Sequence, residues 1–265
     1  MNRDLCTYNS QTTAVAFIIS NSGTKGFNSE SLLRQLVYER FGNKKYTHGT
    51  TTWKYSKHAG PAPIVTHNMQ NENDLILNRI RDIGLVNKVA DKVKVVYMPE
   101  FLDSNSPLFP ICYEDFISGC HVGVFPSYYE PWGYTPAECI VNGVCSVSSN
   151  LSGFGCFMEE CLQEPKANGL LILDRRNKVY HDAVAELRDY LFAYCSKTER
   201  KRLIEKHRVA KLGYILGWGS LISEYSKAIN LAKIRCERKE NINEKLHTIS
   251  TKNKENQNLP FESNY

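Results

Sequence analysis

The sequence has no long hydrophobic run and no closely spaced pair of cysteines. Its longest apolar run, residues 14–19, is too short to cross a bilayer, and the first residues, MNRDLCTYNSQTT, lack the apolar centre of a signal peptide. The nine cysteines are scattered, without Cys-x-x-Cys or His-x-His spacing, which favours buried, reduced thiols over a metal or redox site. These absences predict a cytoplasmic protein without a membrane span.

The composition is that of a folded protein. A chain of 265 residues is long enough to bury a sizeable core, and 42% hydrophobic residues with 11% aromatics exclude a largely disordered chain. The formal net charge of +5 suits an anionic small ligand as well as a nucleic acid, so the charge does not choose between them.

Short apolar runs alternate with stretches of helical periodicity. The run TAVAFIIS at 13–20 is typical of a strand buried on both faces, and further strands are expected at 93–98, 121–125, 146–149 and 170–173. Between and after them, helical spacing predicts helices at 29–38, 74–83, 113–118, 136–142, 155–161, 181–196 and 198–212. This alternation predicts an α/β fold with a parallel sheet, which binds ligands at the carboxyl ends of its strands.

Two regions do not fit this alternation. Residues 42–63 are rich in Gly, Lys, Thr and Pro without a period, which predicts a loop. From about residue 234 the chain turns to Lys, Glu, Asn and Thr, which predicts a disordered tail over 234–265.

The segment GVFPSYYEPWGYTPAE, residues 123–138, carries the most chemical information. After the strand at 121–125, a loop leads to Thr135-Pro136-Ala137-Glu138, which has the form of a helix start. Thr135 is expected as the N-cap, Pro136 as the first helical residue and Glu138 as the third, which together make a capping box. On this interpretation Glu138 only satisfies its own helix terminus.

The same helix start also suits a ligand. A helix N-terminus beyond the carboxyl end of a strand offers N–H groups and a positive dipole to a phosphate. Gly133 allows close approach of the backbone, Trp132 and Tyr134 can wall a flat or sugar-like group, and Glu130 can accept hydrogen bonds from hydroxyls. These features predict a nucleotide or phosphosugar site without naming the ligand.

A basic helix is expected near the end of the folded part. Residues 198–211 read TERKRLIEKHRVAK. One interpretation is a solvated helix face with Glu–Lys/Arg pairs. Another is a phosphate site, because Arg202 and Lys206 are four residues apart and share one face. A nucleic-acid surface is less favoured, since no aromatics separate the basic residues.

The run GVFPSYYEPWGYTPAEC, followed by SSNLSGFGCFMEE and ILDRR, resembles the animal and fungal glycogen synthases almost residue for residue. Weaker similarity includes PIVTHNM, NDLILNRIR, KVKVVYMPEFL and YEDFISGCH, and AVAFII with FNSESL at the front. The likeness spans roughly residues 12–230, with a poor match near 43–60.

This resemblance implies the Rossmann-like C-terminal domain of a two-domain GT-B glycosyltransferase, covering 12–233. Residues 1–11 do not match, and the family's N-terminal domain has no counterpart here. The implied reaction transfers glucose from UDP-glucose to the 4-hydroxyl at a glycogen non-reducing end, with retention and without a metal or organic cofactor. The implied catalytic carboxylates are Glu130, facing the donor glucose, and Glu138, near the ribose. The implied cradle of UDP-glucose comprises Glu130, Trp132, Gly133, Tyr134 and Thr135.

The basic helix resembles the arginine-rich helix through which eukaryotic glycogen synthases sense glucose-6-phosphate. The resemblance assigns the effector phosphate to His121, Arg202 and Lys206, and the rest of the basic cluster to Arg200, Arg208 and Lys211. Lys206 and Lys211 stand at usual arginine positions and Glu199 replaces a basic residue. Because lysine cannot contact a phosphate in bidentate fashion, we expect weaker or altered activation.

The family also implies glycogen, a homo-oligomer and glycogenin as partners. A GT-B enzyme needs both walls of its cleft to position donor against acceptor, so this chain alone is expected to catalyse poorly or not at all. Two alternatives therefore remain beside the enzyme. One is a non-catalytic module that binds UDP-glucose or glucose-6-phosphate, and the other is a nucleic-acid-binding α/β protein.

Overall fold

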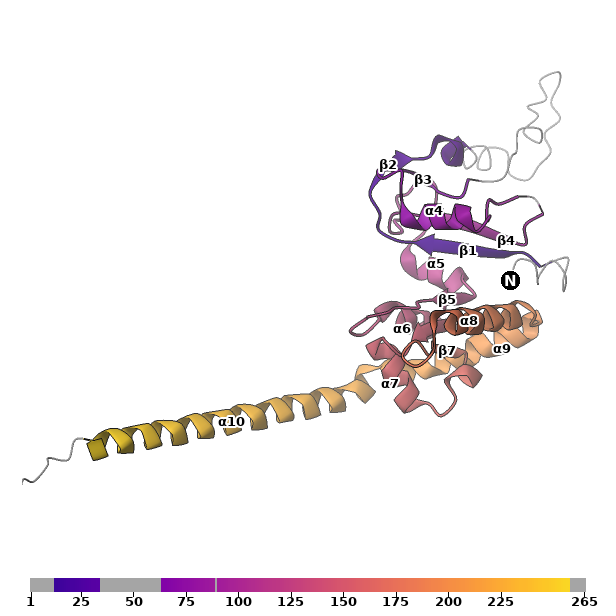
Figure 1. The fold of residues 1–265 in the computed structure, drawn as a ribbon. Coiled ribbons are helices and arrows are strands. Elements are labelled where there is room, and N and C mark those ends of the chain that lie inside the picture. Colours follow the sequence, from indigo (N-terminus) through magenta and orange to yellow (C-terminus); the bar gives the residue numbers. More distant parts are fainter. Residues whose placement is uncertain (1–11, 34–62, 89, 258–265) are drawn as a thin grey trace, which may run out of the picture. The chain divides into compact units, whose positions relative to one another are not determined.

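The computed structural model describes residues 12–33, 63–88 and 90–257, with side chains as far as Leu246. The chain divides into two units, one ending at Lys211 and one beginning at Leu212. Figure 1 shows the elements of both units. Each unit is described by itself.

The first unit opens with a pair of parallel strands. β1 (Ala14–Ile19) pairs with β4 (Val93–Met98) from Ala14 opposite Val93 to Ile19 opposite Met98. Helix α4 (Leu75–Asp82) covers one face, where Leu77 and Ile80 pack against Val95 and Tyr97. A short antiparallel ladder joins β2 (Thr24–Phe27) to β3 (His67–Met69).

The prediction that the first strand is buried on both faces is wrong. On the face of β1 that α4 does not cover, Val15 is 52% exposed and Phe17 is 37% exposed. Phe17 still contacts the rings of Phe109 and Phe116, with centroids 5.9 and 5.3 Å away. An apolar run alone cannot tell a fully buried strand from one with a partly open apolar face.

A further sheet of the first unit has three strands. Its strands are β5 (Val122–Val124), β6 (Cys145–Ser149) and β7 (Leu170–Leu173), all parallel and in the order β5-β6-β7. The central strand β6 is buried along its whole length. The prediction of a parallel α/β fold is confirmed for this part of the chain.

Helices pack on both faces of this sheet. Residues of α8 (Tyr180–Cys195), among them Tyr190, pack against Val147 of β6 and Leu171 of β7. A separate cluster joins Ile117 of α5 (Tyr113–Gly119) to Cys139 of α6 (Tyr134–Val141). The remaining elements of the unit are α7 (Gly153–Cys161), the 3-10 helix η1 (Pro165–Asn168) and α9 (Glu199–Ala210).

The parallel arrangement creates two distinct edges. Pro126, Asn150 and Asp174 follow the carboxyl ends of β5, β6 and β7 and therefore lie at one edge of the sheet. His121 precedes β5 and belongs to the opposite, amino-terminal edge. Any ligand of the 126–138 segment and any ligand of His121 thus occupy different ends of the sheet.

The second unit contains the 3-10 helix η2 (Lys211–Leu216), apart from its first residue, and the 40-residue helix α10 (Trp218–Gln257). Residues 234–257 are therefore helical, where the sequence predicted a disordered tail. Their many Lys, Glu and Arg residues are good helix formers, so propensity alone favours this helix. Within the described part of the chain, no helix has the length and apolarity needed to cross a membrane.

Three sequence predictions fall partly or wholly outside the described residues. The helix expected at 29–38 is present over 29–33, and its remainder lies in the part that is not described. The loop at 42–63 and the non-matching segment 1–11 also lie there, apart from Pro63. The division into a domain at 12–233 and a tail stays a prediction.

Candidate functional site

The loop that follows β5 is tied to the start of α7. The N–H of Gly153 donates to the carbonyl of Glu130 at 2.9 Å, and the N–H of Phe154 donates to the carbonyl of Trp132 at 2.7 Å. Gly153 is required there, because a Cβ at this position would overlap the carbonyl oxygen of Pro131. Glu130 is thereby fixed by its backbone at the carboxyl edge of the sheet.

Helix α6 begins two residues earlier than the sequence predicted. Its N-cap is Gly133, in the left-handed region with φ 109°, and Tyr134 is the first helical residue. Thr135 is therefore the second helical residue and Glu138 the fifth, so the predicted capping box is wrong. A glycine can adopt this φ without steric cost, which lets the turn into the helix occur before Thr135.

The start of α6 has no side-chain cap, whereas the first N–H groups of α7 already have hydrogen-bond acceptors. The N-cap of α6, Gly133, has no side chain that could accept a hydrogen bond, and Pro136 has no N–H to satisfy. At α7, the N–H groups of Gly153 and Phe154 donate to the loop carbonyls, and Ser152 accepts from the N–H of Gly155 at 2.9 Å. Of these two helix starts, α6 is the one suited to an anion.

The Glu138 carboxylate is held by a neighbouring helix instead of its own N-terminus. The Tyr113 hydroxyl of α5 donates to Oε2 of Glu138 at 2.9 Å. Burial, and then the hydrogen bond to Glu138, raise the pKa of Tyr113 well above its usual 10. The phenol therefore stays protonated and able to donate at any physiological pH. Sequence reasoning missed Tyr113, because only the fold brings α5 beside α6.

The two aromatic residues of the predicted cradle differ in their surroundings. Trp132 packs on Phe154 with centroids 6.0 Å apart and on Phe157 at 5.5 Å, so its ring helps hold the loop against α7. Tyr134 is 74% exposed and open to a ligand. Thr135 is also exposed, one residue further along the helix.

Two arginines that sequence reasoning did not assign lie at the same edge, directly after β7. The guanidinium of Arg175 lies 3.4 Å from the centroid of the Tyr128 ring and donates to the carbonyl of Pro126. Arg176 donates to the carbonyl of Asn150 at 2.9 Å. Their position in the motif ILDRR, immediately after an expected strand, was the signal that could have found them.

Asn150 links the loops that follow β6 and β7. Its side-chain oxygen accepts from the backbone N–H of Arg175 at 2.9 Å and of Arg176 at 3.2 Å. Its amide nitrogen donates to Asp174 at 2.7 Å. Hydrogen bonds to Asn177 and Asn150 lower the pKa of Asp174, so that this carboxyl stays ionised as an acceptor. Asn150 thus joins the loops after β6 and β7, and Arg175 joins the loop after β7 to Pro126, which follows β5.

At the opposite edge the fold brings together the three residues assigned to the effector phosphate. Burial lowers the pKa of His121, and the charges of Arg202 and Lys206 lower it further. Lys206 donates to the carbonyl of Ser118 at 3.3 Å, near the end of α5, and Arg202 donates to that of Lys197 at 2.6 Å. A cluster of one neutral imidazole and two cations is suited to an anion.

The other members of the basic cluster lie differently. Arg208 donates to the carbonyl of Ala167 in η1 at 2.7 Å, which gives this side chain a structural contact. Arg200 and Lys211 are exposed. The interpretation of this helix as a merely solvated face is therefore incomplete, because Arg202, Lys206 and Arg208 all contact backbone carbonyls.

Together the parallel strands and the helices that pack on them define an α/β protein, a class in which ligands commonly bind where parallel strands end and helices begin. The comparison with known families specifies the class. Residues 53–263 match the model of the family described as glycogen synthase.

Individual relatives agree with this match. The liver glycogen [starch] synthase of Rattus norvegicus is 41% identical over 261 residues, which cover 86% of this chain and 37% of the rat protein. Glycogen [starch] synthase of Neurospora crassa is 40% identical, over 88% of this chain and 38% of its own length. Glycogen [starch] synthase isoform 2 of Saccharomyces cerevisiae is 49% identical over 173 residues, which cover 64% of this chain and 24% of the yeast protein.

The chain belongs to the glycogen synthase family. It spans about 37% of the length of the rat relative that it matches. The resemblance drawn from the 123–138 segment is confirmed at the level of the family.

Proposed function

We propose that this chain forms the nucleotide-sugar-binding part of a glycogen synthase of the GT-B type. The reaction is the retaining transfer of glucose from UDP-glucose to the 4-hydroxyl at a non-reducing end of glycogen. Membership of the family supports the reaction class. The uncapped start of α6, beside the loop that carries Glu130, is the observation that carries the assignment of the donor site.

In this proposal the diphosphate lies at the N-terminus of α6. As the bond between glucose and UDP breaks, negative charge grows on the diphosphate and positive charge on the anomeric carbon. The N–H groups of Tyr134 and Thr135 and the dipole of α6 are already oriented, so they stabilise the leaving group without reorganising. The cations Arg175 and Arg176 at the same edge add to this positive potential.

The two carboxylates have separate roles in the proposal. Glu130 accepts hydrogen bonds from the donor glucose, held by the bonds between its loop and α7. Glu138 lies two helical positions beyond Pro136. Its carboxylate, oriented by Tyr113, lies near the ribose of the donor. Trp132 supports the loop, while Gly133 allows close approach and Tyr134 stays open to the ligand. Neither a metal nor an organic cofactor is assigned a role.

The effector site is proposed at the opposite edge of the sheet. His121, Arg202 and Lys206 would contact the phosphate of glucose-6-phosphate, and the electrostatic coupling among them supports this grouping. Because Lys206 stands at a usual arginine position and lysine cannot contact a phosphate in bidentate fashion, weaker or altered activation is expected. Arg200, Arg208 and Lys211 complete the basic cluster.

By family, the proposed partners are glycogen, further copies of the chain and glycogenin. A cytoplasmic location is proposed with them. The eight cysteines that the structure describes are all free, which suits a reducing compartment.

Incorporation of labelled glucose from UDP-glucose into glycogen tests the function. Turnover that Glu130→Ala abolishes, and that the exposed helical control Glu160→Ala preserves, would support the enzyme. Binding of UDP-glucose without turnover would support the alternative of a non-catalytic module. Binding of RNA that weakens with salt, ignores UDP and is lost in Arg202→Ala would contradict both and favour the nucleic-acid alternative.

A further inference from the structure

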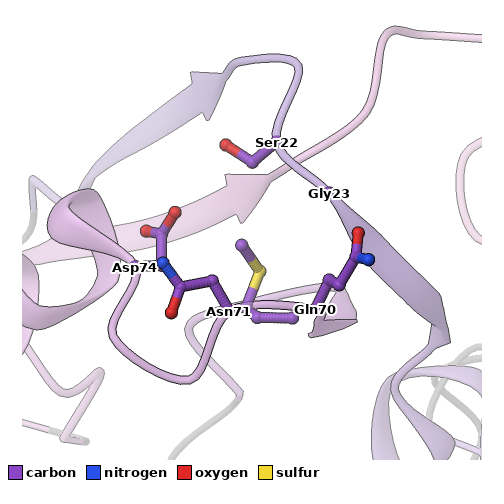
Figure 2. Close-up of a pocket in the computed structure, with 6 residues that line it drawn as sticks. Ser22, Gly23, Gln70, Asn71 and Asp74 are labelled. Atoms are coloured by element: carbon purple, nitrogen blue, oxygen red, sulfur yellow. The ribbon is translucent and has the colours of Figure 1, made fainter.

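A polar hollow lies at the carboxyl ends of β1 and β4, away from the 126–138 loop in sequence. Its volume is about 340 Å³, and its lining residues are Ser22, Gly23, Met69, Gln70, Asn71 and Asp74. Figure 2 shows these side chains around the hollow, contributed by the segment after β1 and by the segment from β3 to α4. The carboxyl end of a parallel strand pair is where α/β sheets bind ligands.

The floor of this hollow is organised by the buried hydroxyl of Tyr97. It donates to Oδ2 of Asp74 at 3.3 Å and lies 3.0 Å from the hydroxyl of Ser22. The other carboxylate oxygen of Asp74 accepts from the N–H of Leu77 at 2.8 Å, as the N-cap of α4. Asp74 and Ser22 are therefore held in place before any ligand arrives.

The rim offers amide groups. Oδ1 of Asn71 accepts from the N–H of Asn73 at 2.9 Å, which leaves its NH₂ group to donate. Gln70 is anchored through its backbone, since its N–H donates to the carbonyl of Gly23 at 2.9 Å. Its side chain lies over Gly23, where a Cβ would be only 2.5 Å from Oε1 of Gln70. The absence of a side chain at residue 23 thus sets the place of this amide.

The lining chemistry selects a neutral ligand rich in hydroxyl groups. None of the six lining residues is cationic, and the Asp74 carboxylate repels an anion, so a phosphate is disfavoured. A carboxylate, two amides and a hydroxyl instead supply acceptors and donors for sugar hydroxyls. The volume is large enough for one glucose unit with room for water.

We propose that this hollow binds a glucosyl unit of an α-glucan chain. The proposal rests on the proposed function, because that function makes glycogen the polymer this chain encounters. It adds a point of attachment on the polymer that is separate from the donor site. The hollow would hold the protein on the glucan between transfer events.

Titration with maltotriose, followed by the NMR signals of the Gln70 and Asn71 side-chain amides, tests the proposal. We expect saturable shifts of both amides and a Kd in the millimolar range, typical of a small open sugar site. Gly23→Ala should displace the Gln70 amide and weaken binding about tenfold, the equivalent of about 1.4 kcal/mol. Gly119→Ala is the matched control, since a Cβ there meets no atom within 4 Å.

UDP is titrated into the same samples, which separates this proposal from the donor site. Maltotriose binding without UDP binding would leave the hollow standing and overturn the donor site. UDP binding with unmoved amides at about 20 mM maltotriose, which means a binding free energy weaker than about 2.3 kcal/mol, would overturn the hollow alone. If Gly23→Ala does not fold, Asn71→Ala replaces it, and unchanged maltotriose affinity in the folded variant overturns the proposal.

Discussion

The hydroxyl of Tyr113 donates a 2.9 Å hydrogen bond to Oε2 of Glu138 and so joins α5 to α6. This contact replaces the local capping role that the sequence suggested for Glu138. A carboxylate whose orientation depends on another helix is positioned by the tertiary fold. Its partner can therefore be removed without disturbing the start of α6.

Tyr113→Phe should weaken binding of UDP-glucose several-fold while leaving the fold intact. The hydrogen bond is exposed, so its loss should lower the free energy of unfolding by no more than about 1 kcal/mol. Calorimetric titration and thermal unfolding measure the two effects. Tyr129→Phe is the control, because Tyr129 is 81% exposed. Equal affinities of the two variants would show that Glu138 does not need Tyr113.

Binding of glucose-6-phosphate should depend on pH through His121. Its pKa lies below 6.5, so the ring is neutral at pH 7, and a bound phosphate would favour the protonated ring. Proton uptake on binding means that effector affinity rises as the pH falls through 6.5 and below. Thermal unfolding at a series of pH values, with and without millimolar effector, measures this dependence.

The charges around His121 can be tested separately by NMR titration of its ring. Lys206→Ala should raise the His121 pKa towards 6.5, because the lysine charge lowers it. Arg200→Ala should leave that pKa unchanged, since Arg200 is not among its causes. A thermal midpoint that does not respond to millimolar glucose-6-phosphate at any pH would overturn the effector site.

Arg175→Ala should loosen the loop that carries Glu130. The variant loses the hydrogen bond to the Pro126 carbonyl and the stacking on Tyr128. Together these contacts contribute about 1–2 kcal/mol locally, so amide exchange over 126–133 should accelerate about tenfold or more. Hydrogen–deuterium exchange measures this, with the exposed Arg188→Ala as control. Unchanged exchange in the loop would mean that its bonds to α7 suffice.

Gly153→Ala should be strongly destabilising. The added Cβ would overlap the Pro131 carbonyl, a backbone atom that cannot rotate away. We expect the free energy of unfolding to fall by about 2–3 kcal/mol, as for overpacking at a rigid contact. Urea denaturation of this variant beside Gly119→Ala, whose added Cβ meets open space, measures the difference. A stability equal to that of the control would contradict the tight junction between loop and α7.

The extent to which the sequence predicted the structure follows from the range of each interaction. Strands at 93–98 and 170–173 were predicted at their observed bounds, because apolar periodicity is a local signal. The start of α6 was predicted two residues late, because the left-handed Gly133 is invisible to a pattern of capping residues. The exposed face of β1 depends on what packs against it, which a local pattern does not contain.

The same limit applies to the proposed donor site, since the sequence groups only residues that are close along the chain. Glu130, Tyr134 and Thr135 could be grouped into one proposed site because they are close in sequence. Tyr113 and Arg175 were not grouped with them, because they lie on other elements and contact Glu138 and the Tyr128 ring only in the folded chain. The part of α10 from residue 234 was expected to be a disordered tail, since its polar composition is typical both of disorder and of an exposed helix.

We propose that the chain binds a nucleotide sugar at the start of α6. Titration of the ¹⁵N-labelled chain with UDP-glucose tests it most directly. We predict that the backbone amides of Tyr134 and Thr135 show the largest saturable shifts, and that UDP reproduces them. Saturable shifts confined to α9, or no shifts at millimolar UDP-glucose, would contradict a nucleotide-sugar site at the start of α6.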